Sequence, residues 1–519
     1  MTRSLDILAA LDGAEVLSND GSPVSDDAST LLGRMPSPVE NWSAGERRAE
    51  GGEAPAAVSA TPRDMGYSVE AMNRRHALVR VGSKVMVLDE NPDAPIEQRL
   101  TLLTAEAFHA WYANTATEIC TADGTVKSTT WSARWWKDRQ RRQYKGLCFF
   151  PNPDGAPSPE GFFNLWKGYS VAARKGGSWG IFRDHLLTNV CGGDEGLFRW
   201  VFAFFAHMMQ RPRERIGVAL VMRGKMGTGK TLPVEVFGSL IASHFFLVDD
   251  PRYVTGNFNA HMASCVLLGA EEAVWAGDKA AEGRLKGLIT STFQMIENKG
   301  VDPIRLDNYV RLVMTSNEGW VVPAGKDERR FCVTDVSDRC KENHEYFAEL
   351  LAELDDGGRE ALLHDLLDFD LSTVNLRTIP KTDALLEQKI RSFSSVEAWW
   401  FERLKEGSTR VKSGYWEQEV DRQALFADYL EKSDKVGIKR RAIETEVGME
   451  MKKLVPTLKE ARPTKMTERG SERVRVYVLP DLDECRMWFE SAVGQEVDWG
   501  DGPAEKNRVE GEDDGPSNL

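Results

Sequence analysis

The sequence predicts an α/β fold built on a parallel sheet that is covered by helices. A glycine-rich loop, GKMGTGKT at residues 224–231, follows the apolar run 216–222 and precedes a helix-like segment. Four more apolar runs of strand length follow and alternate with segments of helical spacing. They span residues 244–249, 264–270, 309–317 and 331–335. Because ligands bind at the carboxyl ends of parallel strands, the polar residues that follow these runs are expected to share one site.

The glycine-rich loop has the residue types of a cradle for a nucleotide triphosphate. Its glycines let backbone N–H groups turn toward a phosphate, Lys230 brings a point charge, and the Thr231 hydroxyl can join the shell of a magnesium ion. The sequence therefore predicts ATP and Mg²⁺ as cofactors. The residues expected to bind them are Gly224, Gly227, Thr228, Gly229, Lys230 and Thr231.

Polar side chains after the later strands complete this prediction. Glu271 and Glu272 follow the run 264–270, and they are candidates for the magnesium ligand and for the carboxylate that orients the attacking water. Asn317 ends the next run and can hydrogen-bond the γ-phosphate or that water. Arg329 and Arg330 supply guanidinium groups of the kind that stabilise phosphoryl-transfer charge, often across a subunit boundary. Each residue alone also fits an ordinary surface role, but their order behind the loop favours catalysis.

Composition and charge bound the class of protein. The 519 residues are 41% hydrophobic, enough for a large core and several domains. The formal net charge of -14 is unevenly distributed. Residues 481–519 hold 12 acidic and 3 basic side chains, whereas residues 432–475 hold 13 basic and 7 acidic ones. A basic module is thus followed by an acidic tail, a pattern that leaves room for a nucleic-acid partner.

Cysteine usage and hydropathy give the expected location. The seven cysteines are scattered and form no C-x-x-C pair, which argues against disulfides and structural zinc. The most apolar stretch, residues 197–209, is shorter than the ~20 residues of a membrane span and indicates a buried helix. With no secretory signal in sight, we expect a reducing cytoplasm and no membrane partner.

The N-terminal part is expected to comprise two regions, the first without a compact fold and the second folded. Residues 1–62 predict a short helix and then a Ser, Gly, Pro and acid-rich segment without fixed structure. Residues 63–205 predict a mixed, mostly helical domain with a strand hairpin at 76–89 and helices at 102–115 and 131–144. The last of these combines three tryptophans with four arginines and one lysine. It fits either a nucleic-acid surface or an amphipathic helix with its tryptophans in the core.

Four segments follow the N-terminal domain. Residues 206–345 are the expected ATPase core and 346–410 a helical extension. Residues 411–490 pattern as helix, helix and strand around a basic turn, which suggests a winged-helix-like module. A protein-docking module is the alternative. Residues 491–519 form the acidic tail, for which we expect no fixed structure.

Residues 148–404 resemble the superfamily-three helicases of phages and plasmids, especially the helicase modules of phage primase-helicase and primase-polymerase proteins. The resemblance covers about half of the chain, in one order. The segments that carry it are NLWKG at 164–168, GKMGTGKT at 224–231, TGNFN at 255–259, EEA at 271–273, LKGLIT at 285–290, IENKG at 296–300, TSN at 315–317 and DERR at 327–330. It implies an AAA+-like core that assembles as a homo-oligomeric ring, usually a hexamer, hydrolyses ATP between subunits and moves along single-stranded DNA.

The resemblance also implies roles for single positions. Lys230 and Thr231 match the Walker A lysine and hydroxyl, Glu272 the catalytic carboxylate and Asn317 the polar sensor. Arg329 or Arg330 matches the arginine finger, and Lys286 a further basic residue near the phosphates. Lys299, between two strand-like segments, matches the tip of the hairpin that grips DNA in the channel. A solvated turn is the plainer reading of Lys299.

Two departures qualify this expectation. Glu271 stands where the pattern usually has Asp, which changes the reach to magnesium. No acidic pair suited to a primase-polymerase metal site precedes residue 148, so a primase or polymerase partner would be a separate protein. The expected function is an ATP-dependent DNA helicase acting on single-stranded and forked DNA. The alternatives are an ATPase that loads or remodels replication proteins without processive unwinding, and a non-catalytic ring scaffold.

Overall fold

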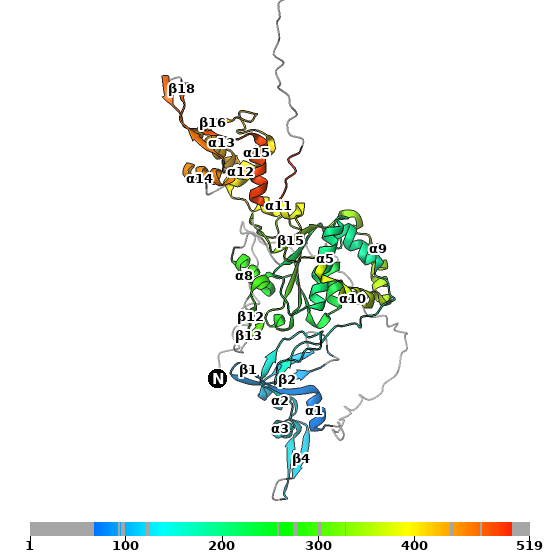
Figure 1. Ribbon diagram of the computed structural model, residues 1–519. Helices are drawn as coiled ribbons and strands as arrows, with labels where there is room; N and C mark the ends of the chain where they lie inside the picture. Colours follow the sequence, from blue (N-terminus) through cyan, green and yellow to red (C-terminus); the bar gives the residue numbers. More distant parts are fainter. Residues whose placement is uncertain are drawn as a thin grey trace, which may run out of the picture. The chain divides into compact units, whose positions relative to one another are not determined.

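Five parallel strands form the sheet that the sequence predicts, in the order β10–β11–β14–β9–β15 (Figure 1). The central strand β14 is buried along its whole length, as expected for parallel strands covered on both faces. Because β14 lies between β9 and β11, it separates the strand that enters the glycine-rich loop from the strand that ends in Glu271. The five strands are β9 (Ala219–Arg223), β10 (Phe245–Val248), β11 (Leu267–Glu271), β14 (Arg311–Ser316) and β15 (Phe331–Asp335).

The computed structural model describes residues 67–500, apart from 92–93, 95–98, 121–123, 257–258, 273–278, 298–302, 327, 436–440 and 468–469. The predicted N-terminal helix, the Ser- and Gly-rich segment after it and the acidic tail beyond residue 500 lie outside the described residues, as does Lys299. None of the helices in the described ranges has the length and apolar character needed to cross a bilayer.

Helices pack on the sheet through large apolar side chains. The predicted buried helix is α5, which begins at an N-cap formed by Asp194 and has its apolar residues buried from Leu197 to Met209. Phe205 of α5 stacks on Phe237 of α6 at 3.7 Å between ring centroids. These helices and their neighbours are α4 (Gly180–Asp184), the π-helix η2 (His185–Val190), α5 (Glu195–Gln210), α6 (Leu232–Ser239), η3 (Ala242–His244), α7 (Pro251–Thr255), η4 (Ala260–Ser264) and α8 (Lys279–Thr290).

An antiparallel hairpin is inserted between α8 and β14. Its strands β12 (Phe293–Ile296) and β13 (Ile304–Asp307) pair from Phe293 opposite Asp307 to Ile296 opposite Ile304. The hairpin predicted around Lys299 is therefore present, although its tip lies outside the described residues. Downstream of β15, the chain forms η5 (Asp338–Cys340), α9 (His344–Glu353), η6 (Leu354–Gly358), α10 (Arg359–Asp368) and η7 (Leu371–Thr373).

The N-terminal domain contains more strand than the sequence suggests. The predicted hairpin is present as β1 and β2, within a sheet of order β3–β2–β1–β6. The helices expected at 102–115 and 131–144 are each only seven residues long, and strands take up part of both ranges. Between residues 180 and 205 the predicted range is helical, as α4, η2 and the first turns of α5. The elements are α1 (Val69–Arg75), β1 (His76–Val81), β2 (Lys84–Glu90), β3 (Leu100–Leu103), α2 (Ala105–Trp111), β4 (Ala116–Cys120), β5 (Val126–Thr130), α3 (Trp131–Lys137), β6 (Gln143–Tyr144), β7 (Gly146–Cys148) and β8 (Phe162–Asn164).

The tryptophan- and arginine-rich segment divides between core and surface. Trp135 is fully buried and its indole N–H donates to Asn73 at 2.8 Å, so this tryptophan is a core residue. Trp131 is half-buried and lies under the Arg134 guanidinium at 4.8 Å. Arg142 binds Glu90. This placement favours the amphipathic interpretation over a tryptophan surface for nucleic acid.

A second hydrophobic core organises the C-terminal part. It extends from Leu386 to Val497 and includes α11 and α12, which the sequence analysis assigned to a helical extension. Three short strands form a sheet of order β16–β20–β17. The elements are α11 (Asp383–Arg391), α12 (Ser395–Glu406), β16 (Glu419–Asp421), α13 (Arg422–Lys435), α14 (Glu444–Leu454), β17 (Lys459–Ala461), β18 (Thr464–Thr467), β19 (Gly470–Arg473), β20 (Val476–Val478) and α15 (Leu482–Val493).

Candidate active site

The predicted phosphate-binding residues meet the predicted carboxylates at the carboxyl edge of the sheet. The Thr231 hydroxyl donates to Glu271 Oε1 at 2.8 Å, and Lys230 Nζ donates to Asn317 Oδ1 at 2.5 Å. Lys230 Nζ also lies 4.0 Å from Glu272 Oε1. Five residues from the ends of three strands are thus in direct contact, as the rule for parallel sheets predicts.

The glycine-rich loop has the backbone conformation that its glycines allow. Gly227 and Gly229 have φ of 78° and 81°, where other residues are strained. A Cβ at Gly229 would lie 2.6 Å from the Phe347 ring, so this position also requires close approach. The backbone N–H groups of Gly229, Lys230 and Thr231 donate to no acceptor in the described part of the chain. Such groups at the start of α6 suit phosphate oxygens.

Glu272 is held in place by the strand next to it. Its carboxylate accepts hydrogen bonds from the Asn317 backbone N–H at 2.8 Å and from the Ser316 hydroxyl at 3.0 Å. Its own φ is 51°, in the left-handed region that non-glycine residues rarely adopt. Strain of this kind persists where surrounding contacts enforce it, and it occurs often at catalytic positions.

Glu271 reaches the loop with the longer side chain that distinguishes it from Asp. Its Oε1 accepts a hydrogen bond from the Thr231 hydroxyl, so the two oxygen atoms are adjacent. Both could therefore bind the same magnesium ion. One turn along α6, Glu235 lies close enough for the Glu271 charge to raise its pKa, after the larger effect of burial. Glu235 is a third acidic side chain at this edge, and the sequence analysis did not single it out.

The residues present fit ATP with Mg²⁺. Unbonded N–H groups and Lys230 would hold the phosphates, and Thr231 with Glu271 would supply two oxygen ligands to the metal. Magnesium in such sites keeps waters and phosphate oxygens as its remaining ligands, so two protein ligands suffice.

Other predicted residues lie elsewhere. Lys286 pairs with Glu282 in its own helix. The carbonyls of Leu288 and Ile289, further along that helix, bind Arg215, which precedes β9. This end of α8 therefore lies at the amino edge of the sheet, and the structure does not bring Lys286 to the phosphate-binding loop.

The arginine pair also lies at the amino edge. Arg330 O accepts the Ala219 N–H at the start of β9, whereas the loop begins after Arg223 at the other end. Five strand residues separate them by about 16 Å, beyond the reach of an arginine side chain. Arg329 is exposed, and Arg330 is half-buried beside Glu328. Neither arginine can act on the loop of its own chain.

Two buried side chains, Arg223 and His185, support the loop, and the sequence analysis singled out neither. Arg223, the last residue of β9, forms a bidentate ion pair with Asp335 at 2.6 and 2.7 Å, and it donates to Gly319 O at 2.8 Å. Asp335 raises the pKa of Arg223. His185, in the π-helix η2, packs against Gly229, and burial lowers its pKa. The only sequence signal for Arg223 is its place at the end of an apolar run. His185 had none.

The base of the β12–β13 hairpin is anchored by a residue from the TGNFN segment. The Asn259 amide donates to Met295 O at 2.8 Å, and its carbonyl oxygen accepts the Glu297 N–H at 2.9 Å. This pair of bonds fixes the last residues of β12 before the hairpin tip. Asn259 thus positions the hairpin rather than the phosphates.

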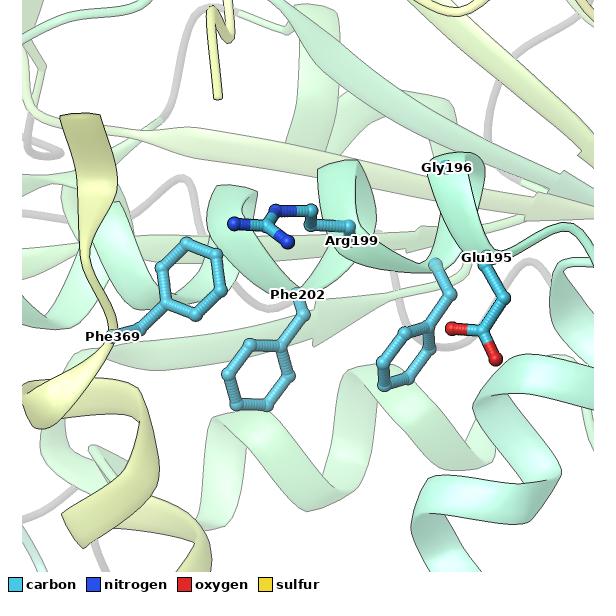
Figure 2. A pocket seen from close by; sticks show the side chains of 6 residues that line it. Glu195, Gly196, Arg199, Phe202 and Phe369 are labelled. Atoms are coloured by element: carbon cyan, nitrogen blue, oxygen red, sulfur yellow. The ribbon is translucent and has the colours of Figure 1, made fainter. Parts of the chain in front are cut away.

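A hollow of about 400 Å³ lies apart from these residues, beside the first turns of α5 (Figure 2). Phe202 and Phe369 meet edge to face there at 5.4 Å, and the Arg199 guanidinium extends toward the Phe369 ring. None of the predicted site residues lines it, so it is separate from the candidate active site.

Comparisons with known proteins match the same region. A family of unknown function, DUF5906, matches residues 222–330, from the end of β9 to the arginine pair. The DNA primase-polymerase of Nitratiruptor phage NrS-1 is 24% identical over 233 residues, which is 42% of this chain and 32% of that protein. The chain thus matches about a third of that relative's length, and the match agrees with the phage primase-polymerase part of the resemblance.

Solved structures show the same fold over most of the chain. The apo structure of the NrS-1 C-terminal region covers 78% of this chain and 96% of its own, with a TM-score of 0.55 and 15% identity. An A-form apo structure of that region covers 79% and 98%, with a TM-score of 0.53. At this identity the likeness shows the fold alone.

Proposed function

We propose that this chain is an ATP-hydrolysing DNA helicase that acts in phage DNA replication and works as a ring. The observation that carries the proposal is the cluster at the carboxyl edge, where Lys230, Thr231, Glu271, Glu272 and Asn317 lie within hydrogen-bonding or ion-pair distance. The similarity to a phage DNA primase-polymerase supports the setting in phage DNA replication. The core would be of the AAA+ type, and the C-terminal module would be a winged helix.

Each side chain has a role that its position allows. Lys230 and the N–H groups of the loop would hold the phosphates, and Glu272 would orient water and accept its proton. Asn317 would stay in contact with Lys230 and hold Glu272 through its backbone N–H. ATP would supply the bond that is cleaved, and Mg²⁺ would offset the negative charge that develops.

The strand β14 offers a physical link between hydrolysis and movement on DNA. Its carboxyl end leads into Asn317 at the nucleotide cluster, and its amino end follows the β12–β13 hairpin. Six residues of strand span about 20 Å, and this one is buried throughout, so it would move as a rigid unit. A shift of Asn317 on hydrolysis would then displace the hairpin, where Lys299 would follow the phosphates of single-stranded DNA.

Strand displacement from a forked DNA tests the proposal. Wild type should separate the strands with ATP, Lys230→Ala should lose both hydrolysis and displacement by at least about 100-fold, and Lys299→Ala should lose mainly displacement. Lys127→Ala, which removes an exposed lysine of β5, is the control and should behave as wild type. Hydrolysis without displacement on either fork polarity would favour the ATPase that loads or remodels replication proteins.

A further inference from the structure

A hairpin of the C-terminal module and the residues at its base carry more basic than acidic side chains. In chain order the module has two helices, a strand, two helices, a strand, the hairpin β18–β19, a further strand and a final helix. Figure 1 shows the hairpin reaching away from α13 and α14. Residues 459–475, which include it, hold six basic and three acidic side chains, whereas α14 holds two basic and three acidic ones.

Helix α14 is a poor surface for an anionic partner. Its two lysines are already paired, Lys452 with Glu460 at 2.7 Å and Lys453 with Glu450 at 2.9 Å. Glu446 is exposed near its start. A helix that enters the major groove of DNA passes between the phosphates of the two strands. The net negative charge of α14 would repel these phosphates.

The base of the hairpin presents the opposite arrangement. Arg462, Arg473 and Arg475 are exposed, and none of the three forms an ion pair with another described residue. Glu460 lies near Arg475, but Lys452 already binds that carboxylate. The three guanidinium groups are therefore available to an external anion.

The strand register places these arginines together. Ala461 lies opposite Val476 and Thr464 opposite Arg473, so the same register sets Arg462 opposite Arg475. The Pro463 carbonyl accepts the Val474 N–H at 3.1 Å, which continues this pairing between the strands. Like charges directly opposite one another destabilise a strand pair, so the arrangement is not explained by stability. A row of phosphates would offset the repulsion.

We propose that Arg462, Arg473 and Arg475 bind the sugar-phosphate backbone of duplex DNA, so that the module contacts DNA through its hairpin and not through α14. Residues 459–475 contain no aromatic side chain, and sequence-tolerant binding of single strands relies on stacking on such rings. Duplex DNA has the higher density of phosphates and needs no stacking surface. The contact carries no base readout, so the affinity is independent of sequence.

The test is the salt dependence of duplex binding by the full chain, without ATP. Fluorescence anisotropy with a blunt, labelled 30-base-pair duplex gives the slope of log affinity against log salt. The variant R462A/R473A/R475A should reduce that slope by about 2.7, since each lost phosphate contact removes about 0.9. The matched control K412A/K452A/K453A removes the same charge from lysines of this module that are already paired, and it should keep the wild-type slope.

A second variant separates contact from folding. R462K/R473K/R475K keeps three cations at the same positions and should retain the wild-type slope, with the same melting temperature for all variants. An unchanged slope in the alanine variant, or an equal loss in the control, overturns the inference. Hydrolysis of ATP by the alanine variant should stay at the wild-type rate, and Lys230→Ala should keep the duplex slope. The two proposals therefore fail separately.

Discussion

At the scale of single residues, Glu272 is the side chain on which the proposed hydrolysis would depend most directly. Its carboxylate is fixed by Ser316 and by the Asn317 N–H, and its backbone is strained. Glu272→Gln preserves the shape and keeps one oxygen for the Asn317 N–H, while its NH₂ group can donate to the Ser316 hydroxyl, which accepts as well as donates. Because the amide cannot accept a proton, ATP turnover should fall by about 10²–10⁴-fold.

Nucleotide affinity separates this loss from a folding defect. A fluorescent ATP analogue should bind the glutamine variant within a few-fold of wild type, because Lys230 and Thr231 are unchanged. Hydrolysis at the wild-type rate would remove Glu272 from the mechanism and leave Glu271 or Glu235 as the carboxylate to examine.

Gly229 is the second residue whose identity the structure demands. In Gly229→Ala the new Cβ would lie 2.6 Å from Phe347 at a φ of 81°, a backbone conformation that costs about 1–2 kcal/mol for a residue with a side chain. We expect a lower melting temperature and loss of nucleotide binding. In α8, Gly283→Ala is the matched control: its Cβ would meet no atom within 4 Å, so it should stabilise the helix by about 0.5–1 kcal/mol. Equal effects in thermal melts would contradict this contrast.

At the scale of elements, His244 links the N-terminal segment to the sheet in one protonation state. Its Nε2 accepts the Lys167 N–H at 2.9 Å, its Nδ1 donates to Ser264 O at 2.8 Å, and Trp166 stacks on the ring at 4.4 Å. Burial lowers its pKa to about 4. Protonation would break the bond from Lys167, so the folded state resists it.

The pH dependence of stability follows from this pKa. The unfolded histidine takes up a proton near pH 6.5 and the folded one only near pH 4, so the stability due to neutral His244 is complete above pH 6.5. It falls as the pH drops from 6.5 to 4, by about 1.4 kcal/mol per pH unit. The pKa values of other buried histidines, among them His76 and His207, are lowered too, so the wild-type slope contains their contributions as well. In urea unfolding, the slope of His244→Gln should therefore be shallower than that of wild type by the His244 amount. Parallel curves would show that His244 titrates normally in the folded chain.

The elements also show what a sequence can reveal. The five sheet strands and the meeting of Lys230, Glu271, Glu272 and Asn317 were predictable, because buried parallel strands are continuous apolar runs and their carboxyl ends share an edge. The helix expected over residues 131–144 ends at Lys137, since the chain turns so that Gln143 and Tyr144 pair with β1. That pairing, like the packing of His185 on Gly229, joins distant segments and leaves no local pattern.

At the scale of the whole molecule, the two edges of the sheet carry different parts of the proposed machine. The cluster proposed to bind the nucleotide lies at the carboxyl edge, while the exposed Arg329 lies at the amino edge, out of reach of its own loop. If Arg329 serves catalysis, it must therefore reach the nucleotide of a neighbouring chain. Each site would then be built from one chain's Lys230 and another chain's Arg329.

Mixing two inactive variants tests this shared site. Lys230→Ala and Arg329→Ala should each hydrolyse ATP poorly alone. In mixed rings, an Arg329→Ala chain has an intact loop, and a Lys230→Ala neighbour offers it an intact arginine. Activity should therefore return on mixing, toward a quarter of the wild-type rate for random equal mixing. A mixture that stays inactive while the chains exchange would show that Arg329 does not act between subunits. The control is the double variant K230A/R329A, mixed with either single variant. No site in such a ring combines an intact Lys230 with an intact Arg329, so activity should not return.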